Sequence, residues 1–271
     1  MRALLGAHGI HPRKLRGQNF LVDGNLIDAI VREAAPGPDD CVLEVGTGTA
    51  ILTDALVAKA GRVVSCDIDG RLQTIAVGLR EWPDSVAFLE GDILAGKRAL
   101  NPAVIERWTS FAEGRVLRVV SNLPYSIATP FVANLLWSGL PVRDAVLLVQ
   151  REAAERFLAV PRTGGYGPVS VAVRLLSQGA LLRSIGPQVF WPPPKVQSAL
   201  IRITPTDPPR AARLREAGLP ELLHKAFLWR RKTLRKRFTV AQLEAAGIDP
   251  SARPEEVEPQ QWERLLTVPP A

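Results

Sequence analysis

The chain of 271 residues is poor in metal-binding and redox-active side chains, with two cysteines, three histidines and one methionine. A structural zinc site needs about four Cys or His ligands, so this composition argues against a zinc cluster and we expect no metal. Cys41 and Cys66 lie in separate apolar runs that predict strands. We therefore expect two buried, reduced thiols rather than a disulfide, and a cytoplasmic location.

Long apolar stretches are also absent. No run approaches the ~18 apolar residues that a membrane-crossing helix requires. The first ten residues are weakly apolar and lack the charged-then-apolar order of a secretory signal. These absences exclude a membrane protein. We also expect the protein to be a monomer in the cytoplasm.

The net charge of the chain is +7, and acidic residues are scarce in one part of it. Residues 201–238 contain eleven Lys and Arg against three Asp and Glu, whereas the remainder contains 23 basic and 24 acidic residues. A basic block of this kind favours a nucleic-acid-binding surface over a solvated basic face, which is the alternative. The side chains that we expect to contact phosphates are Arg230, Arg231, Lys232, Arg235, Lys236 and Arg237.

Short apolar runs alternate with helix-like segments between residues 40 and 150. The runs contain four or five residues and are rich in Val and Leu, which is typical of strands buried on both faces. They are Cys41–Val45, Arg62–Cys66, Val86–Leu89, Val116–Val120 and Ala145–Val149. The alternation predicts an α/β fold with a mostly parallel, doubly wound sheet. Two later runs, Ala180–Ile185 and Ser198–Ile203, predict an edge hairpin on this sheet.

The composition changes near residue 204, where a turn-rich, proline-rich connector begins. After it we expect only helices, over Leu219–Trp229, Arg231–Phe238, Val240–Ala246 and Gln260–Leu266. The sequence therefore predicts two domains. Residues 1–203 contain the sheet and a basic N-terminal arm, and residues 204–271 form a small all-helical domain that contains the basic block.

The ends of the first three predicted strands indicate an adenosine-containing cofactor. The first strand is followed by Gly46-Thr-Gly48, which allows a tight turn and close approach of a ligand to the backbone. The second and third strands end at Asp67 and Asp92, and Asp69 follows closely. Each acidic residue alone is more often a helix cap or a turn residue. Together, at successive carboxyl ends of a parallel sheet, they predict a crevice in which Asp67 binds the ribose and Asp92 binds the adenine amino group.

The fourth predicted strand ends in Asn122-Leu-Pro124-Tyr125. An amide oxygen and a backbone carbonyl are two acceptors that match the two hydrogens of an exocyclic NH2 group. Pro124 fixes the turn, and Tyr125 offers a flat face on which a base can stack. The motif therefore predicts methylation of an adenine amino group by positioning and electrostatics. An ordinary turn is the alternative interpretation.

In its motifs the chain resembles the ribosomal RNA adenine dimethyltransferases of the KsgA/RsmA type along nearly its whole length. The matching segments, in this order, are residues 17–21, residues 44–53, Gly91-Asp-Ile-Leu94, Asn122-Leu-Pro-Tyr125 and residues 190–196. The resemblance implies a Rossmann-like class I methyltransferase fold. It also implies that S-adenosyl-L-methionine (S-adenosylmethionine) is the methyl donor, and that the partner is 16S ribosomal RNA in the small subunit or its precursor. Two adjacent adenines of the 3′-terminal hairpin loop would become N6,N6-dimethyladenosine.

The resemblance also implies roles for individual residues. Asn19, Leu21, Gly46, Asp92 and Asn122 would contact the cofactor. The catalytic set would be Asn122, Pro124, Tyr125 and Phe190, whose ring would close on the second face of the target base.

The chain departs from this family at two positions, and other functions remain open. Asp67 stands where the family usually has glutamate, and Ala50 stands where relatives commonly have a further glycine. A 23S ribosomal RNA adenine dimethyltransferase of the antibiotic-resistance type shares the catalytic motifs. A non-catalytic nucleic-acid-binding factor on the same scaffold is the second alternative. A DNA adenine methyltransferase would usually have Asp-Pro-Pro-Tyr where this chain has Asn122–Tyr125.

Overall fold

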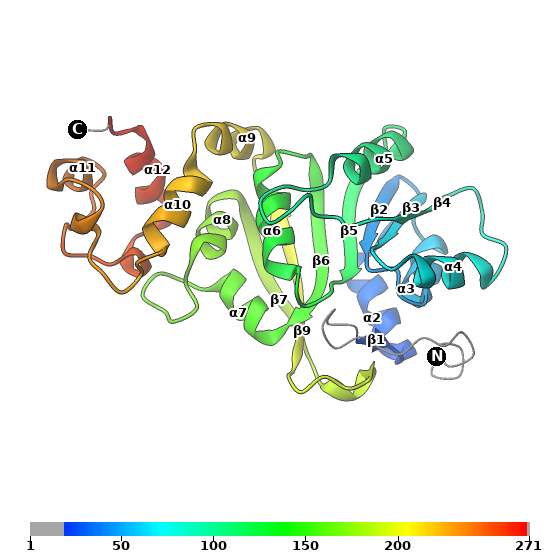
Figure 1. Cartoon of the computed structure of the whole chain (residues 1–271). Coiled ribbons are helices and arrows are strands. Elements are labelled where there is room, and N and C mark those ends of the chain that lie inside the picture. The colour runs from blue at the N-terminus through cyan, green and yellow to red at the C-terminus, as the bar shows by residue number, and fades with distance from the viewer. Residues whose placement is uncertain (1–18, 270–271) are drawn as a thin grey trace. The chain divides into compact units, whose positions relative to one another are not determined.

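The apolar runs of the sequence form a seven-stranded sheet in the computed structural model, which describes residues 19–269 (Figure 1). Its strands are β2 (Asp40–Val45), β3 (Arg62–Asp67), β4 (Val86–Glu90), β5 (Val116–Asn122), β6 (Val142–Gln150), β7 (Ser177–Ile185) and β9 (Ser198–Pro205). They follow the spatial order β4-β3-β2-β5-β6-β9-β7. The five strands from β4 to β6 are parallel, and β9 pairs antiparallel with β6. The predicted mostly parallel sheet is confirmed, with the two later strands together at one end.

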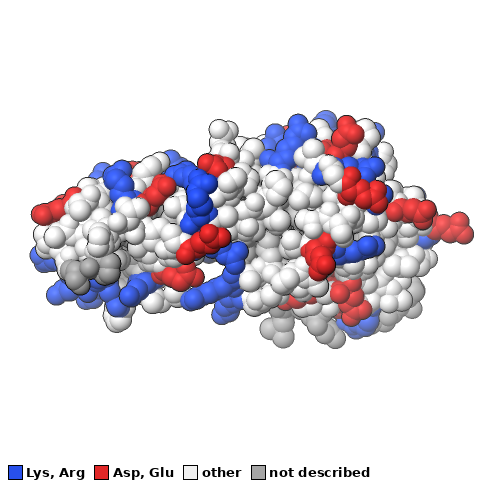
Figure 2. Space-filling model, turned by 90° about the horizontal axis from the view of Figure 1, so that it is seen from above, with Lys and Arg blue, Asp and Glu red and all other residues white. Residues whose placement is uncertain are grey.

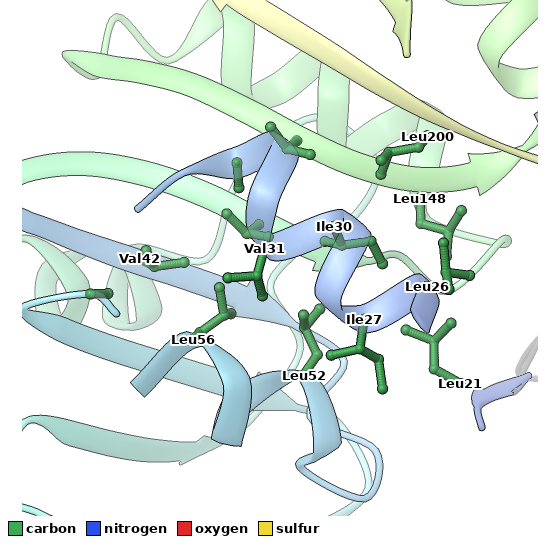
Figure 3. Close-up of a cluster of buried hydrophobic side chains, with 14 of the residues drawn as sticks. Leu21, Leu26, Ile27, Ile30, Val31, Val42, Leu52, Leu56, Leu148 and Leu200 are labelled. Atoms are coloured by element: carbon green, nitrogen blue, oxygen red, sulfur yellow. The ribbon is translucent and has the colours of Figure 1, made fainter. Parts of the chain in front are cut away.

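Helices α2 (Gly24–Ala34) and α3 (Ile51–Val57) cover one face of this sheet. The sequence begins α2 with Asp23, whose Oδ1 accepts a hydrogen bond from the Leu26 N–H at 2.9 Å. Apolar side chains from both helices pack against those of the strands, as Figure 3 shows for Ile30 of α2 and Leu148 of β6. Full burial of one such side chain stabilises the fold by about 1.5–3 kcal/mol.

Helix α5 (Pro102–Ala112) covers the opposite face, and helix α4 (Gly70–Gly78) packs against β3 and β4. Val42 points into the cluster with α2 and α3, so its neighbour Cys41 points to the other face of the sheet. There the Cys41 thiol lies beside the buried Trp108 of α5. Cys41 and Cys66 are both free and buried, as predicted.

A short antiparallel pair, β1 (Phe20–Leu21) with β8 (Phe190–Trp191), was not predicted because two-residue strands show no periodicity. Leu21 lies opposite Phe190 in this pair, and both side chains are buried in the cluster of α2 and α3. The pair therefore fixes the segment that contains Asn19. The basic N-terminal arm, with Gly17 and Gln18 of the first motif, lies outside the described residues.

The chain divides into two compact units, which we describe separately. The first unit comprises the described part of Met1–Phe131 with Pro141–Ala154 and Ala180–Thr204. The second comprises the described part of Pro205–Ala271, together with Val132–Leu140 and Glu155–Gly179. The change of unit between Thr204 and Pro205 lies one residue after the predicted boundary at 203/204. Two internal segments of the predicted first domain, Val132–Leu140 and Glu155–Gly179, belong to the second unit.

The remaining helices are α6 (Ala128–Trp137), α7 (Arg151–Leu158), α8 (Pro168–Leu176), α9 (Pro208–Glu216), α10 (Leu219–Phe227), α11 (Val240–Ala245) and α12 (Pro259–Thr267). In the second unit an aromatic cluster joins Tyr166, Phe227 of α10 and Trp262 of α12, with ring centroids 5.7–6.2 Å apart. The Tyr166 hydroxyl donates a hydrogen bond to the Val257 carbonyl at 2.9 Å. Within the described residues, no helix combines the length and the apolar character needed to cross a membrane.

The helix predicted over Arg231–Phe238 is wrong, because the segment forms turns and one 3-10 turn, η3 (Leu234–Lys236). A helix would place like charges four residues apart, at Arg231 and Arg235 and again at Lys232 and Lys236, which is destabilising. The chain instead buries Leu234, whose N–H donates to the Ala252 carbonyl at 2.9 Å. This anchor leaves the basic side chains exposed on both sides of Leu234.

Candidate cofactor and adenine site

One cavity lies at the carboxyl ends of the parallel strands β2, β3, β4 and β5. The lining includes nearly all of the cofactor and catalytic residues that the sequence predicted: Asn19, Leu21, Gly46, Asp67, Asp92, Asn122, Pro124 and Tyr125. These residues come from segments up to 106 positions apart in the sequence, from Asn19 to Tyr125. The parallel sheet brings them together because its successive strands all end at the same edge.

The turn after β2 has left-handed backbone at three positions. Gly46 has a φ of 89° and Gly48 a φ of 55°, which glycine adopts without steric cost. A Cβ at Gly46 would lie 3.3 Å from the Pro124 side chain and 3.6 Å from the Asn122 carbonyl oxygen. The cofactor turn and the Asn122–Tyr125 motif are therefore in direct contact. Ala50, at the start of α3, also has a positive φ of 56°, so this departure from glycine introduces strain at the end of the turn.

The structure distinguishes the two aspartates that follow β3. Asp67 lines the cavity and is buried; its Oδ2 accepts from the Gly48 N–H at 3.0 Å and its Oδ1 from the Asp69 N–H at 2.9 Å. Asp69 instead caps α4 and forms a bidentate ion pair with Arg71, with distances of 2.9 and 3.0 Å. Asp67 is consequently the better candidate for a ribose contact.

The third acidic residue, Asp92, is exposed at the end of β4, and its Oδ1 accepts from the Leu94 N–H at 2.9 Å. Two isoleucines also line the cavity, Ile68 directly after Asp67 and Ile93 directly after Asp92. Ile93 is buried, whereas 54% of Ile68 is exposed. An apolar side chain that is exposed within a cavity fits contact with a flat adenine ring. These isoleucines were not predicted as site residues, although their positions beside the two aspartates are a usable signal.

A buried hydrogen-bond network beneath the glycine turn was also missed. Glu44 is 1% exposed, and its Oε2 accepts from Thr53 Oγ1 at 2.5 Å and from Ser65 Oγ at 2.7 Å. Ser65 lies opposite Glu44 in the β2–β3 register, and its hydroxyl is 2.7 Å from that of Thr47. Gln73 of α4 donates to Thr47 Oγ1 at 3.1 Å and to the carbonyl of Leu89 at 2.7 Å. The network holds the turn to β3 and α4.

Glu44 has an unusual protonation equilibrium. Burial raises its pKa to about 8, although the hydrogen bonds from Thr53 and Ser65 act in the opposite direction. The nearby Asp67 carboxylate raises the pKa further. Glu44 is therefore largely a neutral acid at pH 7 and adds little negative charge beneath the turn.

Asn122, at the end of β5, has an oriented amide group. Its Nδ2 donates to the Asn19 carbonyl at 3.2 Å, and this fixes which way Oδ1 faces. The Pro124 carbonyl accepts from the Ile127 N–H at 3.1 Å, which closes the turn. Because that carbonyl is engaged, the carbonyl of Leu123 is the candidate for the second acceptor beside Asn122 Oδ1.

The two aromatic residues of the predicted catalytic set have different environments. Tyr125 lines the cavity, and its hydroxyl lies 2.7 Å from Ser198 Oγ of β9, so the ring is held in one orientation. Burial raises the pKa of Tyr125, which keeps the phenol neutral. Phe190 is 2% exposed within the cluster of α2 and α3 and is absent from the described lining. Phe190 lies opposite Leu21 in the β1–β8 pair, and its contact with the second face of the target base stays a prediction.

The six predicted phosphate contacts lie together in the second unit, and all are exposed. Arg230 pairs with Glu255 at 3.3 Å, and the Arg237 guanidinium lies over the Trp229 ring. No ion pair of Arg231, Lys232, Arg235 or Lys236 is found in the part of the chain that the structure describes. Figure 2 shows Lys and Arg side chains around the C-terminal helices, interspersed with acidic ones.

Taken together, the first unit has a glycine turn in which a Cβ at Gly46 would lie 3.3 Å from Pro124, two aspartates at consecutive strand ends, and an exposed apolar side chain, Ile68, in the same cavity. These residues fit S-adenosylmethionine, and with the sheet order they define a class I methyltransferase that uses this cofactor.

Comparison with known proteins identifies the family. The model of the "Ribosomal RNA adenine dimethylase" family matches residues 11–268. The chain is 38% identical to ribosomal RNA small subunit methyltransferase A of Chromobacterium violaceum, over 94% of both chains. It is 32% identical to the protein of that name from Shouchella clausii, over 97% of this chain and 91% of the relative. The chain therefore belongs to the ribosomal RNA adenine dimethylase family, and the resemblance predicted from its motifs is confirmed.

Solved structures agree with the fold. A dimethyladenosine transferase from Plasmodium falciparum superposes with a TM-score of 0.72 at 24% identity, covering 91% of this chain and 95% of the other. The 23S rRNA methyltransferase ErmE superposes with a TM-score of 0.58 at 27% identity, covering 92% and 98%. The predicted Rossmann-like methyltransferase fold with C-terminal helices is confirmed.

Proposed function

We propose that this protein dimethylates two adjacent adenines in the 3′-terminal hairpin loop of small-subunit (16S) ribosomal RNA, with S-adenosylmethionine as methyl donor. The observation that supports this substrate most strongly is the similarity to small-subunit methyltransferases A at 32–38% identity over at least 93% of this chain. The intact Asn122–Tyr125 motif in the cavity supports catalysis rather than binding alone.

In this proposal the first unit binds the cofactor through residues of the cavity. Asp67 accepts hydrogen bonds from the ribose hydroxyls, and Asp92 accepts one from the adenine amino group. The Gly46 backbone approaches the ligand closely because it has no Cβ. Asn19 and Leu21 close the cavity from the β1 segment, which its pairing with β8 holds in place.

The proposed chemistry rests on the lone pair of the adenine amino nitrogen. This lone pair is delocalised into the ring, so the nitrogen is a weak nucleophile. In the first transfer, Asn122 Oδ1 and the Leu123 carbonyl would accept one hydrogen each, which favours a tetrahedral nitrogen and directs its lone pair at the methyl group. The nitrogen loses one proton as it gains the methyl group, so in the second transfer one hydrogen remains to be accepted. The cofactor supplies an electrophilic methyl group. The protein contributes orientation and preorganised acceptors.

Tyr125 is proposed to stack on the target adenine. Its hydrogen bond to Ser198 fixes the ring before the base arrives, which lowers the entropy cost of capture. Pro124 sets the position of the ring relative to Asn122 and contacts the cofactor turn at Gly46.

RNA binding is proposed to involve the second unit through the basic side chains Arg230, Arg231, Lys232, Arg235, Lys236 and Arg237. If they contact phosphates, the affinity for RNA should fall steeply with salt concentration. Replacing Arg235 and Lys236 with Ala should reduce the slope of log affinity against log salt by about one to two units, and leave cofactor affinity unchanged. An unchanged slope would remove these two residues from the interface.

The similarity to the 23S rRNA methyltransferase ErmE makes the large subunit the second candidate substrate. The two are separated by incubating the protein with radiolabelled S-adenosylmethionine and either unmethylated small subunits or large subunits, then mapping the labelled nucleotide. Label on two neighbouring adenines of the 16S terminal loop is the expected result. Label on 23S RNA supports the second candidate, and no label on either subunit supports a binding factor.

A further inference from the structure

Two large apolar side chains are exposed side by side at the carboxyl end of α10. Leu228 is 62% exposed and Trp229 is 53% exposed. They directly precede the basic segment, residues 230–237, in which six of the eight residues are Lys or Arg. No Asp or Glu occurs in the sequence between Glu221 and Glu244. An exposed indole in so positive an environment matches an anionic partner that also presents flat, apolar surfaces.

The indole of Trp229 is held in position by this segment. The Arg237 guanidinium carbon lies 5.1 Å from the ring centroid, at cation–π distance. The Trp229 carbonyl accepts from the Lys232 N–H at 2.7 Å, and the buried Leu234 anchors the following turn through Ala252. The chain therefore folds back, so that Arg237 at the end of the segment lies on the ring of Trp229, which directly precedes the segment. An indole has two faces, and Arg237 covers one of them.

We propose that Trp229 is a stacking platform for an unpaired nucleobase of the RNA that the basic segment binds. This proposal rests on the RNA-binding role proposed above for residues 230–237. Single-stranded RNA is the partner that offers bases for stacking and phosphates for the neighbouring cations within one nucleotide of each other. In duplex RNA the bases are already stacked, so Trp229 should contribute little to duplex binding. A protein partner that docks on apolar surface would use Leu228 as much as Trp229.

The test compares the full-length variants Trp229→Leu, Trp229→Phe and Leu228→Ala. Their affinities are measured for a single-stranded oligoadenylate and for a blunt RNA duplex of equal length. We expect Trp229→Leu to weaken single-strand binding about 5- to 100-fold. Trp229→Phe should retain most of the affinity, because it keeps an aromatic face. Leu228→Ala is the matched control, since it removes a neighbouring side chain of similar exposure without an aromatic ring, and it should bind like the parent protein.

Two further readouts distinguish the stacking from the charge contacts. The salt slope should be the same in Trp229→Leu as in the parent, because no charge is removed, whereas Arg235→Ala/Lys236→Ala lowers it. Oligoadenylate should quench tryptophan fluorescence in the parent protein and quench it less in Trp229→Phe. Unaltered single-strand binding by Trp229→Leu, with a normal salt slope, would overturn the stacking proposal alone. Equal losses in Leu228→Ala and Trp229→Leu would overturn it in favour of apolar docking. A flat salt slope in the parent would overturn the RNA-binding role of the segment itself.

Discussion

Replacing the buried Glu44 with Gln should remove a pH dependence of the free energy of unfolding that arises from the burial of its carboxyl group. Glutamine presents an amide oxygen to Thr53 and Ser65 and an N–H in place of the acid's O–H, so the network beneath the glycine turn can persist. The variant differs from the parent mainly in that position 44 no longer titrates.

The sign and size of the effect follow from the raised pKa of Glu44. The pKa is about 8 in the folded protein and 4.5 in an exposed glutamate. Between these values the unfolded chain has lost a proton that the folded protein retains, so the free energy of unfolding falls as the pH rises. The slope is about 1.4 kcal/mol per pH unit. The contribution of the protonated Glu44 side chain to the free energy of unfolding is complete below pH 4.5 and is lost as the pH rises through about 8.

Urea unfolding of both proteins at pH 5, 6, 7, 8 and 9 measures this directly. The stability of Glu44→Gln relative to the parent should increase by up to about 1.4 kcal/mol per unit to near pH 8 and then level off. Other titrating groups cancel in the difference. Glu106→Gln, at an exposed position on α5, is the control and should show a constant difference. A constant difference for Glu44→Gln as well would refute the buried neutral acid.

Three further predictions concern the cofactor turn and the two aspartates. Asp67→Ala and Asp92→Ala should each weaken S-adenosylmethionine binding about 10- to 100-fold in calorimetry without unfolding the protein, and wild-type affinity in both would remove them from the site. Gly46→Ala should lower the free energy of unfolding by about 1–2 kcal/mol and weaken cofactor binding, because the φ of 89° is left-handed and the new Cβ would lie 3.3 Å from Pro124. An unchanged melting temperature would contradict the strained turn. Ala50→Gly should not lower the free energy of unfolding, because Ala50 already has a left-handed φ of 56° that glycine adopts without strain. The same change inside a helix costs ~1 kcal/mol.

The sheet and most of the cavity could be predicted because their signals are local. Runs such as Cys41–Val45 show the length and composition of buried strands, and parallel strands end at a common edge, so Asp67, Asp92 and Asn122 had to lie near one another. Side-chain partners are not local. Asp69 could have bound a ribose on its spacing alone, and only the structure shows it capping α4 and pairing with Arg71.

The features that the sequence did not predict also depend on contacts between residues distant in the chain. Phe190 begins a motif of the family, but no pattern in the sequence indicates its pairing with Leu21 or its burial in the cluster of α2 and α3. The segment Arg231–Phe238 contains good helix formers, yet repulsion between neighbouring cations and the burial of Leu234 override that propensity. The Glu44 network joins residues from two strands and two helices, and no spacing in the sequence indicates that their side chains meet.

In the proposed mechanism, Asn122 accepts a hydrogen bond from the target amino group as the methyl group is transferred. The most direct measurement is the single-turnover rate of methyl transfer to unmethylated small subunits by the parent protein and by Asn122→Ala, with S-adenosylmethionine affinity measured alongside. We expect Asn122→Ala to reduce the rate about 100-fold or more, while cofactor affinity is retained at least in part. A rate near that of the parent, from a folded variant that binds the cofactor, would contradict it.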